Sequence, residues 1–421
     1  MATTVVITGA SAGIGRAVAL EFARTGCNVA LMARGVERLE SAARHARQFG
    51  VEALAIPVDV ADADALDAAA ERVETALGPV DVWVNNAMVT IFAPVHAIRS
   101  DEFRRVTEVT YLGQVHGTLA ALRRMRQRNR GTIVQVGSAL SYRAIPLQSA
   151  YCAAKFAVRG FTDALRSELA HERSRIRLTM VQLPAVNTPQ FDWARSRMAE
   201  KARPMPPIFQ PEAIAPEIVR AAREAPRELW IGHSTAKAII GSMLLSEMSE
   251  NFLPRQDNGG QFTTGPRAGS HADNLFSPPP GDPGTRGRFD NQACTTAVGF
   301  EPAWLRTGGL FLVLASIAGA FIAGAFVLGQ LISEGRNKAV AETFRRRRAP
   351  GRTTSNSNCF RQDPAPTVVA RVNLKGSEHR DVGATLVVAP LANAIRRPGD
   401  HKGRLYTAGD VGETCNPLQN S

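Results

Sequence analysis

Tyr151 and Lys155 are the residues whose types and spacing point most directly to chemistry. They lie four positions apart in a stretch with helical periodicity, so both side chains can face one cleft. Lys155 is the only lysine among the first 200 residues, a region that otherwise carries its positive charge on arginine. An ammonium group can lower the pKa of a nearby phenol and can bind a sugar hydroxyl. The alternative is a packed tyrosine beside a solvated lysine, and this pair by itself leaves both interpretations open.

A glycine-rich loop, Thr8–Gly15, follows the first predicted strand and opens the first predicted helix. Gly9 allows a tight turn there, Gly13 lets the backbone approach a pyrophosphate, and Gly15 permits close helix packing. The N-terminus of the helix then faces the phosphates. Glycine-rich loops are common, but one at the first strand-to-helix turn predicts a dinucleotide site.

The end of the second predicted strand bears on which dinucleotide binds. A site for NAD normally presents a carboxylate here to the ribose hydroxyls, whereas this chain has Ala33 followed by Arg34. A guanidinium can pair with the 2′-phosphate that distinguishes NADP. The sequence therefore favours NADP over NAD, with a solvated surface arginine as the alternative in so arginine-rich a chain.

These residues need a scaffold, and the hydrophobic pattern predicts one. Short β-branched runs alternate with longer amphipathic segments as far as about residue 232, which is typical of repeated strand-helix-strand units. We predict an α/β domain over residues 1–254 with a doubly wound, parallel, seven-stranded sheet. The predicted strands are 3–7, 28–33, 53–59, 80–84, 131–136, 176–182 and 228–231. The predicted helices include 15–25, 63–77, 101–127, 152–171 and 234–251.

The character of the chain changes after this domain. Residues 255–306 are rich in Gly, Pro, Asn, Asp and Ser, which predicts a flexible linker. Residues 307–333 contain no Asp, Glu, Lys or Arg and exceed the ~20 residues that a membrane span needs. We predict one transmembrane helix there, with a buried core helix as the alternative. Residues 334–421, which include Arg345–Arg348, are predicted to form a basic and poorly structured tail.

Composition restricts the partners and the compartment. The net charge is +12, and basic residues that follow a span indicate contact with acidic lipid headgroups more simply than contact with nucleic acid. Five cysteines without metal-ligand spacing indicate neither a disulfide framework nor a metal site. The N-terminus lacks the pattern of a signal peptide, so we expect a single-pass membrane protein with a cytoplasmic catalytic domain. The positive-inside rule alone would place the tail in the cytoplasm instead.

Together these features resemble the short-chain dehydrogenase/reductase family over residues 3 to about 250. The resemblance rests on Thr8–Gly15, Asp59-Val60, Asn85-Asn86-Ala87, Ser138, and Tyr151 with Lys155, in this order. It implies the Rossmann fold and an NADP-dependent oxidoreductase, which transfers hydride between the nicotinamide and a carbonyl or alcohol substrate.

The resemblance also implies a role for each residue. Tyr151 would be the general acid or base, Lys155 would lower its pKa and hold the nicotinamide ribose, and Ser138 would bind the substrate oxygen. Ser11 and Arg34 would take the 2′-phosphate. The implied cofactor-binding residues are Gly9, Ser11, Gly13, Ile14, Gly15, Arg34, Asp59 at the adenine, Val60, Asn86, Tyr151, Lys155 and Thr188 at the nicotinamide.

Three positions depart from the family pattern. Met88 follows Asn-Asn-Ala where the family usually has glycine, and Thr110 stands where an asparagine commonly holds a water in the proton relay. Pro184 is displaced by one from the usual Pro-Gly segment. We expect these changes to lower the rate of catalysis. The alternative function is that of a dinucleotide-binding or scaffold protein with weakened catalysis.

The segment 189–211 is rich in aromatic residues, methionine and proline, and the family places its substrate lid there. Such a lid predicts an apolar carbonyl or alcohol substrate, with simple packing onto the fold as the alternative. Family members often pair through the helices that correspond to 101–127 and 152–171, so a homo-oligomer is plausible. No nucleic-acid partner is expected.

Overall fold

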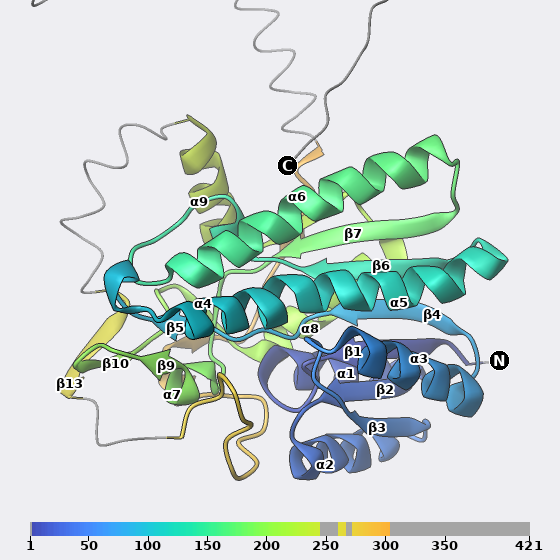
Figure 1. Ribbon diagram of the computed structural model, residues 1–421, viewed down its shortest axis with the longest axis horizontal. Helices are drawn as coiled ribbons and strands as arrows, with labels where there is room; N and C mark the ends of the chain where they lie inside the picture. The colour runs from blue at the N-terminus through green and yellow to red at the C-terminus, as the bar shows by residue number, and fades with distance from the viewer. Residues whose placement is uncertain (1, 245–259, 267–271, 304–421) are drawn as a thin grey trace, which may run out of the picture. The chain divides into compact units, whose positions relative to one another are not determined.

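Seven runs of apolar and β-branched residues form the parallel strands that the alternating pattern predicts. The computed structural model describes residues 2–244, 260–266 and 272–303 of the chain. The sheet order is β12-β7-β6-β4-β1-β2-β3, so the direction of winding reverses between β1 and β4 (Figure 1). The strands are β1 (Thr4–Thr8), β2 (Asn28–Ala33), β3 (Ala53–Pro57), β4 (Val80–Asn85), β6 (Gly131–Val136), β7 (Ile176–Gln182) and β12 (Glu228–Ile231).

Helices cover both faces of this sheet because successive strand residues point to opposite sides. In β1, Val5 and Ile7 join the hydrophobic cluster on one face, and Val6 joins the cluster on the other. The first face packs against α1 (Gly13–Arg24), α2 (Val36–Arg47) and α8 (Pro211–Glu224). The second face packs against α3 (Ala63–Leu77), α4 (Ser100–Thr107), α5 (Gly113–Arg128) and α6 (Ser149–His171).

The helix predicted over 101–127 is interrupted. A π-helical segment, η2 (Glu108–Leu112), separates α4 from α5. Two short 3-10 helices, η1 (Val95–Ala97) and η3 (Ala139–Ser141), lie in the loops that follow β5 and β6. A π-helical turn breaks the regular hydrogen-bond ladder, and such turns often lie at functional sites. Thr110 lies in this one.

Short strands join the loops at the carboxyl ends of the main strands. β5 (Ile91–Phe92) pairs with β9 (Arg195–Ser196), and β11 (Ile208–Phe209) pairs with both β8 (Ala185–Val186) and β14 (Ala293–Cys294). β10 (Glu200–Ala202) pairs with β13 (Phe262–Pro266). The helix α7 (Gln190–Trp193) lies between β8 and β9 in the sequence.

The predicted sheet of seven strands needs one correction. β15 (Gly299–Phe300) pairs antiparallel with β12, so the sheet has eight strands. Without this strand β12 would end the sheet with a row of unpaired backbone groups, and β15 satisfies part of that row.

Residues 255–306 also differ from the flexible linker that their composition predicts, in the parts that the structure describes. These parts contribute β13, β14, β15 and a 3-10 helix, η4 (Asp290–Gln292), all of them packed on the α/β domain. Their few apolar side chains explain why, because Phe262, Leu275 and Phe289 are all buried. We call residues 273–290 the strap.

Several predictions for the C-terminal part lie outside the described residues. They include the transmembrane helix at 307–333, the tail at 334–421 and the last part of the helix at 234–251, of which α9 (His233–Leu244) is described. Among the residues that the structure does describe, no helix is both long and apolar enough to cross a bilayer.

Candidate active site

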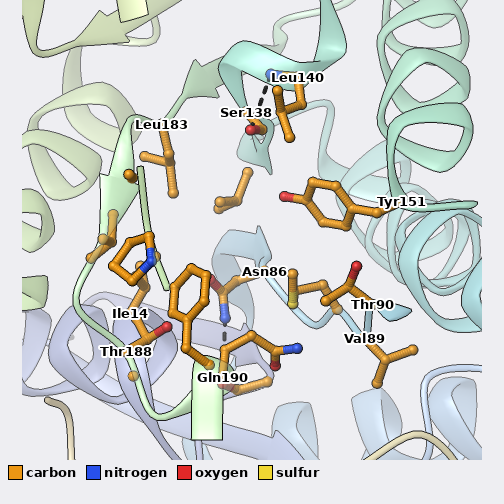
Figure 2. Close-up of a pocket in the computed structure, with 18 of the residues that line it drawn as sticks. Ile14, Asn86, Val89, Thr90, Ser138, Leu140, Tyr151, Leu183, Thr188 and Gln190 are labelled. Carbon is orange, nitrogen blue, oxygen red and sulfur yellow. Dashed lines mark hydrogen bonds between the residues drawn. The ribbon is translucent and has the colours of Figure 1, made fainter. Parts of the chain in front are cut away.

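A cavity of about 840 Å³ opens at the carboxyl ends of the parallel strands, next to the reversal between β1 and β4. Open α/β sheets bind ligands at this place because the loops on either side diverge there. Every site residue that the sequence predicts lines this cavity: Gly9, Ser11, Gly13, Ile14, Gly15, Arg34, Asp59, Val60, Asn86, Ser138, Tyr151, Lys155 and Thr188. Figure 2 shows several of them from strands and loops far apart in the sequence.

Ser138 and Tyr151 form the centre of the cavity's polar side. Figure 2 shows the Tyr151 hydroxyl directed into the cavity on the side of Ser138. Ser138 follows β6 and is fixed by its own backbone, because its amide donates to Gln182 Oε1 at 2.8 Å. Its hydroxyl also accepts a bond of 3.1 Å from the Leu140 amide. A substrate oxygen can therefore meet the Tyr151 hydroxyl and a Ser138 hydroxyl that is already held in place.

Lys155 lies one helical turn after Tyr151 on α6 and is only 2% exposed. Its ammonium donates to the Val136 carbonyl at 2.7 Å and lies 5.8 Å from the centroid of the Tyr151 ring. Burial lowers the pKa of Lys155 to about 7. The lysine is therefore tethered to the end of β6 and close to its point of half-protonation at neutral pH.

Burial acts on the pKa of Tyr151 in the direction opposite to the one that the resemblance implies. It raises this pKa, and the Ser138 side chain opposes the rise only in part. The physical reason is desolvation, which disfavours the charged forms of the phenol and of the ammonium alike. Proximity in the sequence indicated the interaction of Lys155 with Tyr151, but not how far both groups are removed from water.

The glycine loop has the shape that a dinucleotide pyrophosphate requires. Gly9 has a φ of 67°, and a Cβ on Gly15 would lie 2.2 Å from the Gly9 carbonyl oxygen and 2.5 Å from Asn86 Nδ2. Asn86 supports the loop from β4, because its amide donates to the carbonyls of Thr8 at 3.0 Å and Gly9 at 3.3 Å. The glycines thus leave a cradle that side chains would fill, at the N-terminus of α1. The residues present fit a dinucleotide.

Arg34 lines the cavity, but its guanidinium already has partners. It donates to the backbone carbonyls of Asn274 at 2.5 Å, Leu275 at 3.3 Å and Phe276 at 2.9 Å, all in the strap. The predicted adenine contact, Asp59, pairs with Arg105. Both residues therefore line one end of the cavity, which we call the adenosine end because the resemblance implies that the adenosine part of the dinucleotide binds there. Each of them contacts a group that the sequence did not indicate.

Thr110 and Met88 have different positions relative to the cavity. Met88 lines it, as the departure from glycine implies. Thr110 is fully buried, and its hydroxyl donates to the Val89 carbonyl at 2.8 Å and accepts from the Val89 amide at 3.0 Å. The hydroxyl proton is therefore engaged by the backbone, which leaves it no donor capacity for a relay water.

The predicted lid is divided between the cavity and the core. Seven of its nine cavity-lining members are apolar: Pro189, Phe191, Trp193, Pro204, Met205, Pro206 and Pro207, beside the polar Gln190 and Arg203. Ile208 and Phe209 instead form β11 and are buried. The lining is thus apolar where α7 and the loop before β11 meet the catalytic residues.

The strap is the part of the cavity that sequence reasoning missed, as is Arg105, which pairs with the lining residue Asp59. The strap contributes Asn274, Pro278 and Pro279 to the lining. A signal for it was present, since Leu275 and Phe276 interrupt a stretch that is otherwise polar or rich in glycine and proline. Isolated apolar residues in such a stretch indicate contact with a folded surface.

Comparisons with known proteins agree with this geometry. The sequence profile of the short chain dehydrogenase family matches residues 3–199. The chain is 34% identical over 237 residues to the uncharacterized oxidoreductase YxnA of Bacillus subtilis, an alignment that covers 56% of this chain and 66% of that protein. It is 31% identical over 231 residues to the 3-dehydrosphinganine reductase of Danio rerio, which covers 52% of this chain and 68% of the relative.

A solved structure shows the same arrangement of elements. The short-chain dehydrogenase of Streptomyces avermitilis superposes with a TM-score of 0.51 at 27% identity, over 59% of this chain and 95% of that one. The alignments with the two curated proteins span about two thirds of those proteins' lengths. Similarity therefore concerns the α/β domain.

Proposed function

This chain belongs to the short-chain dehydrogenase family, a family of oxidoreductases, and from that premise we propose that it interconverts an apolar carbonyl compound and the corresponding alcohol with NADP(H). The observation that carries the proposal is the meeting of Ser138, Tyr151 and Lys155 with the glycine loop in one cavity. A proton donor and a dinucleotide cradle beside the same apolar space provide what this reaction requires.

NADPH, when bound, supplies the hydride that reduces the carbonyl carbon. Tyr151 then gives its proton to the carbonyl oxygen, while the Ser138 hydroxyl donates a hydrogen bond to that oxygen and orients it. Lys155, in its ammonium form, stabilises the phenolate that remains on Tyr151. It is also placed to hold a ribose hydroxyl. In the direction of oxidation the same residues act in reverse, with the tyrosine as base.

The preference for NADP is supported by positive charge at the adenosine end. Burial lowers the pKa of Arg34 most, Asp59 opposes this shift, and the nearby guanidinium groups of Arg105 and Arg38 lower the pKa further. A cluster of like charges gains free energy when an anion enters, and the 2′-phosphate is the anion by which NADP differs from NAD. The position before Arg34 holds Ala33, which presents no carboxylate to a ribose.

The experiment is a turnover assay on the full chain in detergent with NADPH and a panel of apolar ketones and aldehydes. We expect Tyr151→Phe to reduce turnover by about 10²–10⁴-fold while dinucleotide binding is retained. Tyr111→Phe, a tyrosine change in the π-helical segment η2, is the matched control and should retain activity. Absence of turnover in the wild-type chain, or equal rates for wild type and Tyr151→Phe, would contradict the proposal.

Cofactor preference has its own measurement. The dissociation constants for NADPH and NADH should differ in the wild-type chain, and Arg34→Ala should weaken NADPH binding more than NADH binding. An equal loss for both dinucleotides would argue against recognition of the 2′-phosphate.

The membrane setting and the pairing of subunits are further parts of this proposal. We propose that residues 307–333 anchor the protein as a single span and leave the catalytic domain in the cytoplasm. Carbonate-washed membranes should retain the full chain and release a chain that ends before Thr307.

Pairing through α5 and α6 is supported by two apolar side chains exposed on these helices, Leu119 at 43% and Phe156 at 41%. Light scattering measures the resulting mass.

A further inference from the structure

The strap crosses the adenosine end of the cavity and is attached to the residues on both of its sides. It begins beside α7, where the Asn274 amide donates to the Trp193 carbonyl at 3.0 Å. It then passes the end of β2, where Pro278 lies 3.6 Å from the place that a Cβ on Gly35 would take. Figure 1 shows it as the gold loop near α7 and α2. Its contacts fall at three places, each of which includes or adjoins residues that the family resemblance assigns to the dinucleotide.

The first group is at the adenine and the 2′-phosphate. Leu275 is fully buried and packs in the same hydrophobic cluster as Val60 and Val106. Its carbonyl accepts hydrogen bonds from Arg34 at 3.3 Å and from Arg105 at 3.1 Å. One strap residue therefore fills an apolar space beside Asp59 and holds two guanidinium groups with its backbone.

The second group is at the glycine loop. The Gly284 carbonyl accepts a hydrogen bond of 3.1 Å from the Gly13 amide. The Asp282 carboxylate pairs with Arg16 at 2.5 Å, and Arg16 donates in turn to the Ser41 hydroxyl at 3.0 Å. Since the Arg16 side chain is only 8% exposed, this ion pair is shielded from solvent on one side. The strap is thus fixed to the N-terminal turn of α1.

The third group is at the nicotinamide side. Asn187 accepts a hydrogen bond from the Phe289 amide at 3.0 Å and donates one to Asp290 Oδ1 at 2.9 Å. Gly287 passes so close to the backbone that a Cβ there would lie 2.5 Å from the Thr188 carbonyl oxygen. This close approach requires glycine at position 287.

Between these attachments the strap is a wall of the cavity and leaves the cavity open. Asn274, Pro278 and Pro279 line the same space as the glycine loop and the catalytic residues. The remaining cavity of about 840 Å³ lies within the range of small-molecule and cofactor sites, which is roughly 300–1,000 Å³. The strap therefore covers the adenosine end without filling it.

We propose that the strap, residues 273–290, is an integral part of the dinucleotide site that retains the bound dinucleotide, with Leu275 and Asp282 as its anchors. The proposal rests on the proposed function in that it takes NADP(H) as the ligand. The strap is a wall attached at three places beside the ligand, so we expect a loosened strap to raise the rate of dissociation. It also places the carbonyls of residues 274–276 on Arg34, so the strap fixes the position of the guanidinium that would bind the 2′-phosphate.

The test compares two loosened straps with a matched control in the full-length protein. Leu275→Ala removes the buried anchor, and Asp282→Asn weakens the ion pair with Arg16 without a change of size. Val298→Ala, a change at a side chain that is 69% exposed and lies beyond the strap, is the control. NADPH dissociation rates come from stopped-flow fluorescence with excess competitor, and dissociation constants come from calorimetry. We expect dissociation to accelerate about tenfold or more in Leu275→Ala, less in Asp282→Asn and not at all in the control.

Hydrogen exchange gives a second readout that is independent of turnover. NADPH should increase the protection of amides in residues 273–290 of the wild-type chain, and this gain should be smaller in Leu275→Ala. If Leu275→Ala does not fold, Asp282→Asn carries the comparison by itself, because its change is confined to the ion pair with Arg16 and the hydrogen bond from the Gly284 amide.

The opposing results are distinct. Tighter NADPH binding by the loosened straps would mean that the strap competes with the dinucleotide, and unchanged rates and constants would mean that it only supports the fold. Either result overturns the proposal while the proposed function stands. If the wild-type chain binds no dinucleotide, the proposed function fails, and this inference fails with it.

Discussion

The buried carboxylate of Glu102 accepts a hydrogen bond of 2.9 Å from Arg195, which joins α4 to the segment after α7. Arg197 donates to the same carboxylate at 2.6 Å, and the Arg99 amide donates at 2.9 Å. Arg195 also pairs with Asp273 at 2.8 Å, at the beginning of the strap. A single guanidinium therefore connects the helix, the lid and the strap around one buried negative charge.

Glu102→Gln should destabilise the protein by roughly 2–3 kcal/mol at pH 7, because Arg197 loses its charged partner and Arg195 keeps only Asp273. Burial alone would raise the pKa of Glu102, but hydrogen bonds from Arg197, from the Arg99 backbone and from Arg195 lower it from 4.5 to about 2. The native carboxylate thus binds its proton less readily than the unfolded one, so its contribution is complete above pH 4.5 and is lost as the pH falls towards 2. Urea denaturation of both proteins at pH 7, 4 and 3 measures the difference, which should shrink with acidification. Glu71→Gln, the same change at an exposed glutamate on α3, is the control, and a difference that is constant from pH 7 to 3 would disprove this account.

Thr110→Val should cost roughly 2–5 kcal/mol, since it leaves the buried amide and carbonyl of Val89 without their partner. Valine has nearly the shape of threonine, so loss of packing contributes little. Thr110→Ser keeps the hydroxyl and is the matched control, with an expected cost below about 1.5 kcal/mol. Thermal and urea denaturation measure both variants. Equal stabilities for the two would show that the bonds to Val89 contribute nothing.

Lys155→Met should change how stability depends on pH. The native pKa of Lys155 is about 7, below its ordinary 10.5, so between these values the unfolded chain binds a proton that the native protein does not. Wild-type stability therefore rises with pH across this window, and the lysine destabilises the protein most at pH 7 and below. At pH 7 Lys155→Met should therefore have a larger free energy of unfolding than wild type. This difference should shrink by roughly 2–4 kcal/mol as the pH rises from 7 towards 10.

Urea denaturation at pH 7, 8 and 9 tests this slope, below the range in which Tyr151 titrates. Lys201→Met, at a lysine that is partly exposed on β10, is the control for the loss of a positive charge. A slope that is the same for both variants would show that burial of Lys155 is not the cause.

Gly15→Ala should destabilise the protein by about 3 kcal/mol or more, because its Cβ would lie 2.2 Å from the Gly9 carbonyl and would displace the loop. Dinucleotide binding should fall with it, since the same loop forms the phosphate cradle. Gly160→Ala on α6 is the matched control, because a Cβ there meets nothing within 4 Å. That change should stabilise the protein by roughly 0.5–1 kcal/mol. Similar stabilities for the two variants would contradict the role of close packing at Gly15.

The parallel strands and the positions of the site residues followed from local patterns. Alternation of Val5, Val6 and Ile7 between two faces, and the helical spacing of Tyr151 and Lys155, depend only on periods of 2 and 3.6 residues. Once the strands are parallel, their carboxyl ends meet at one edge, and the loops that follow them converge on one cavity. Together with the family resemblance, the sequence was therefore sufficient to predict the catalytic and dinucleotide-binding residues that line it.

Contacts between distant parts of the chain decided the rest. Arg34 and Leu275 are 241 positions apart, and no period or motif relates them. The eighth strand, the strap and the raised pKa of Tyr151 likewise depend on what covers a surface and how much water it excludes. Desolvation is a property of the packed molecule, so the residues of the site could be read from the sequence, whereas their charges, their partners and the wall over them were set by the tertiary structure.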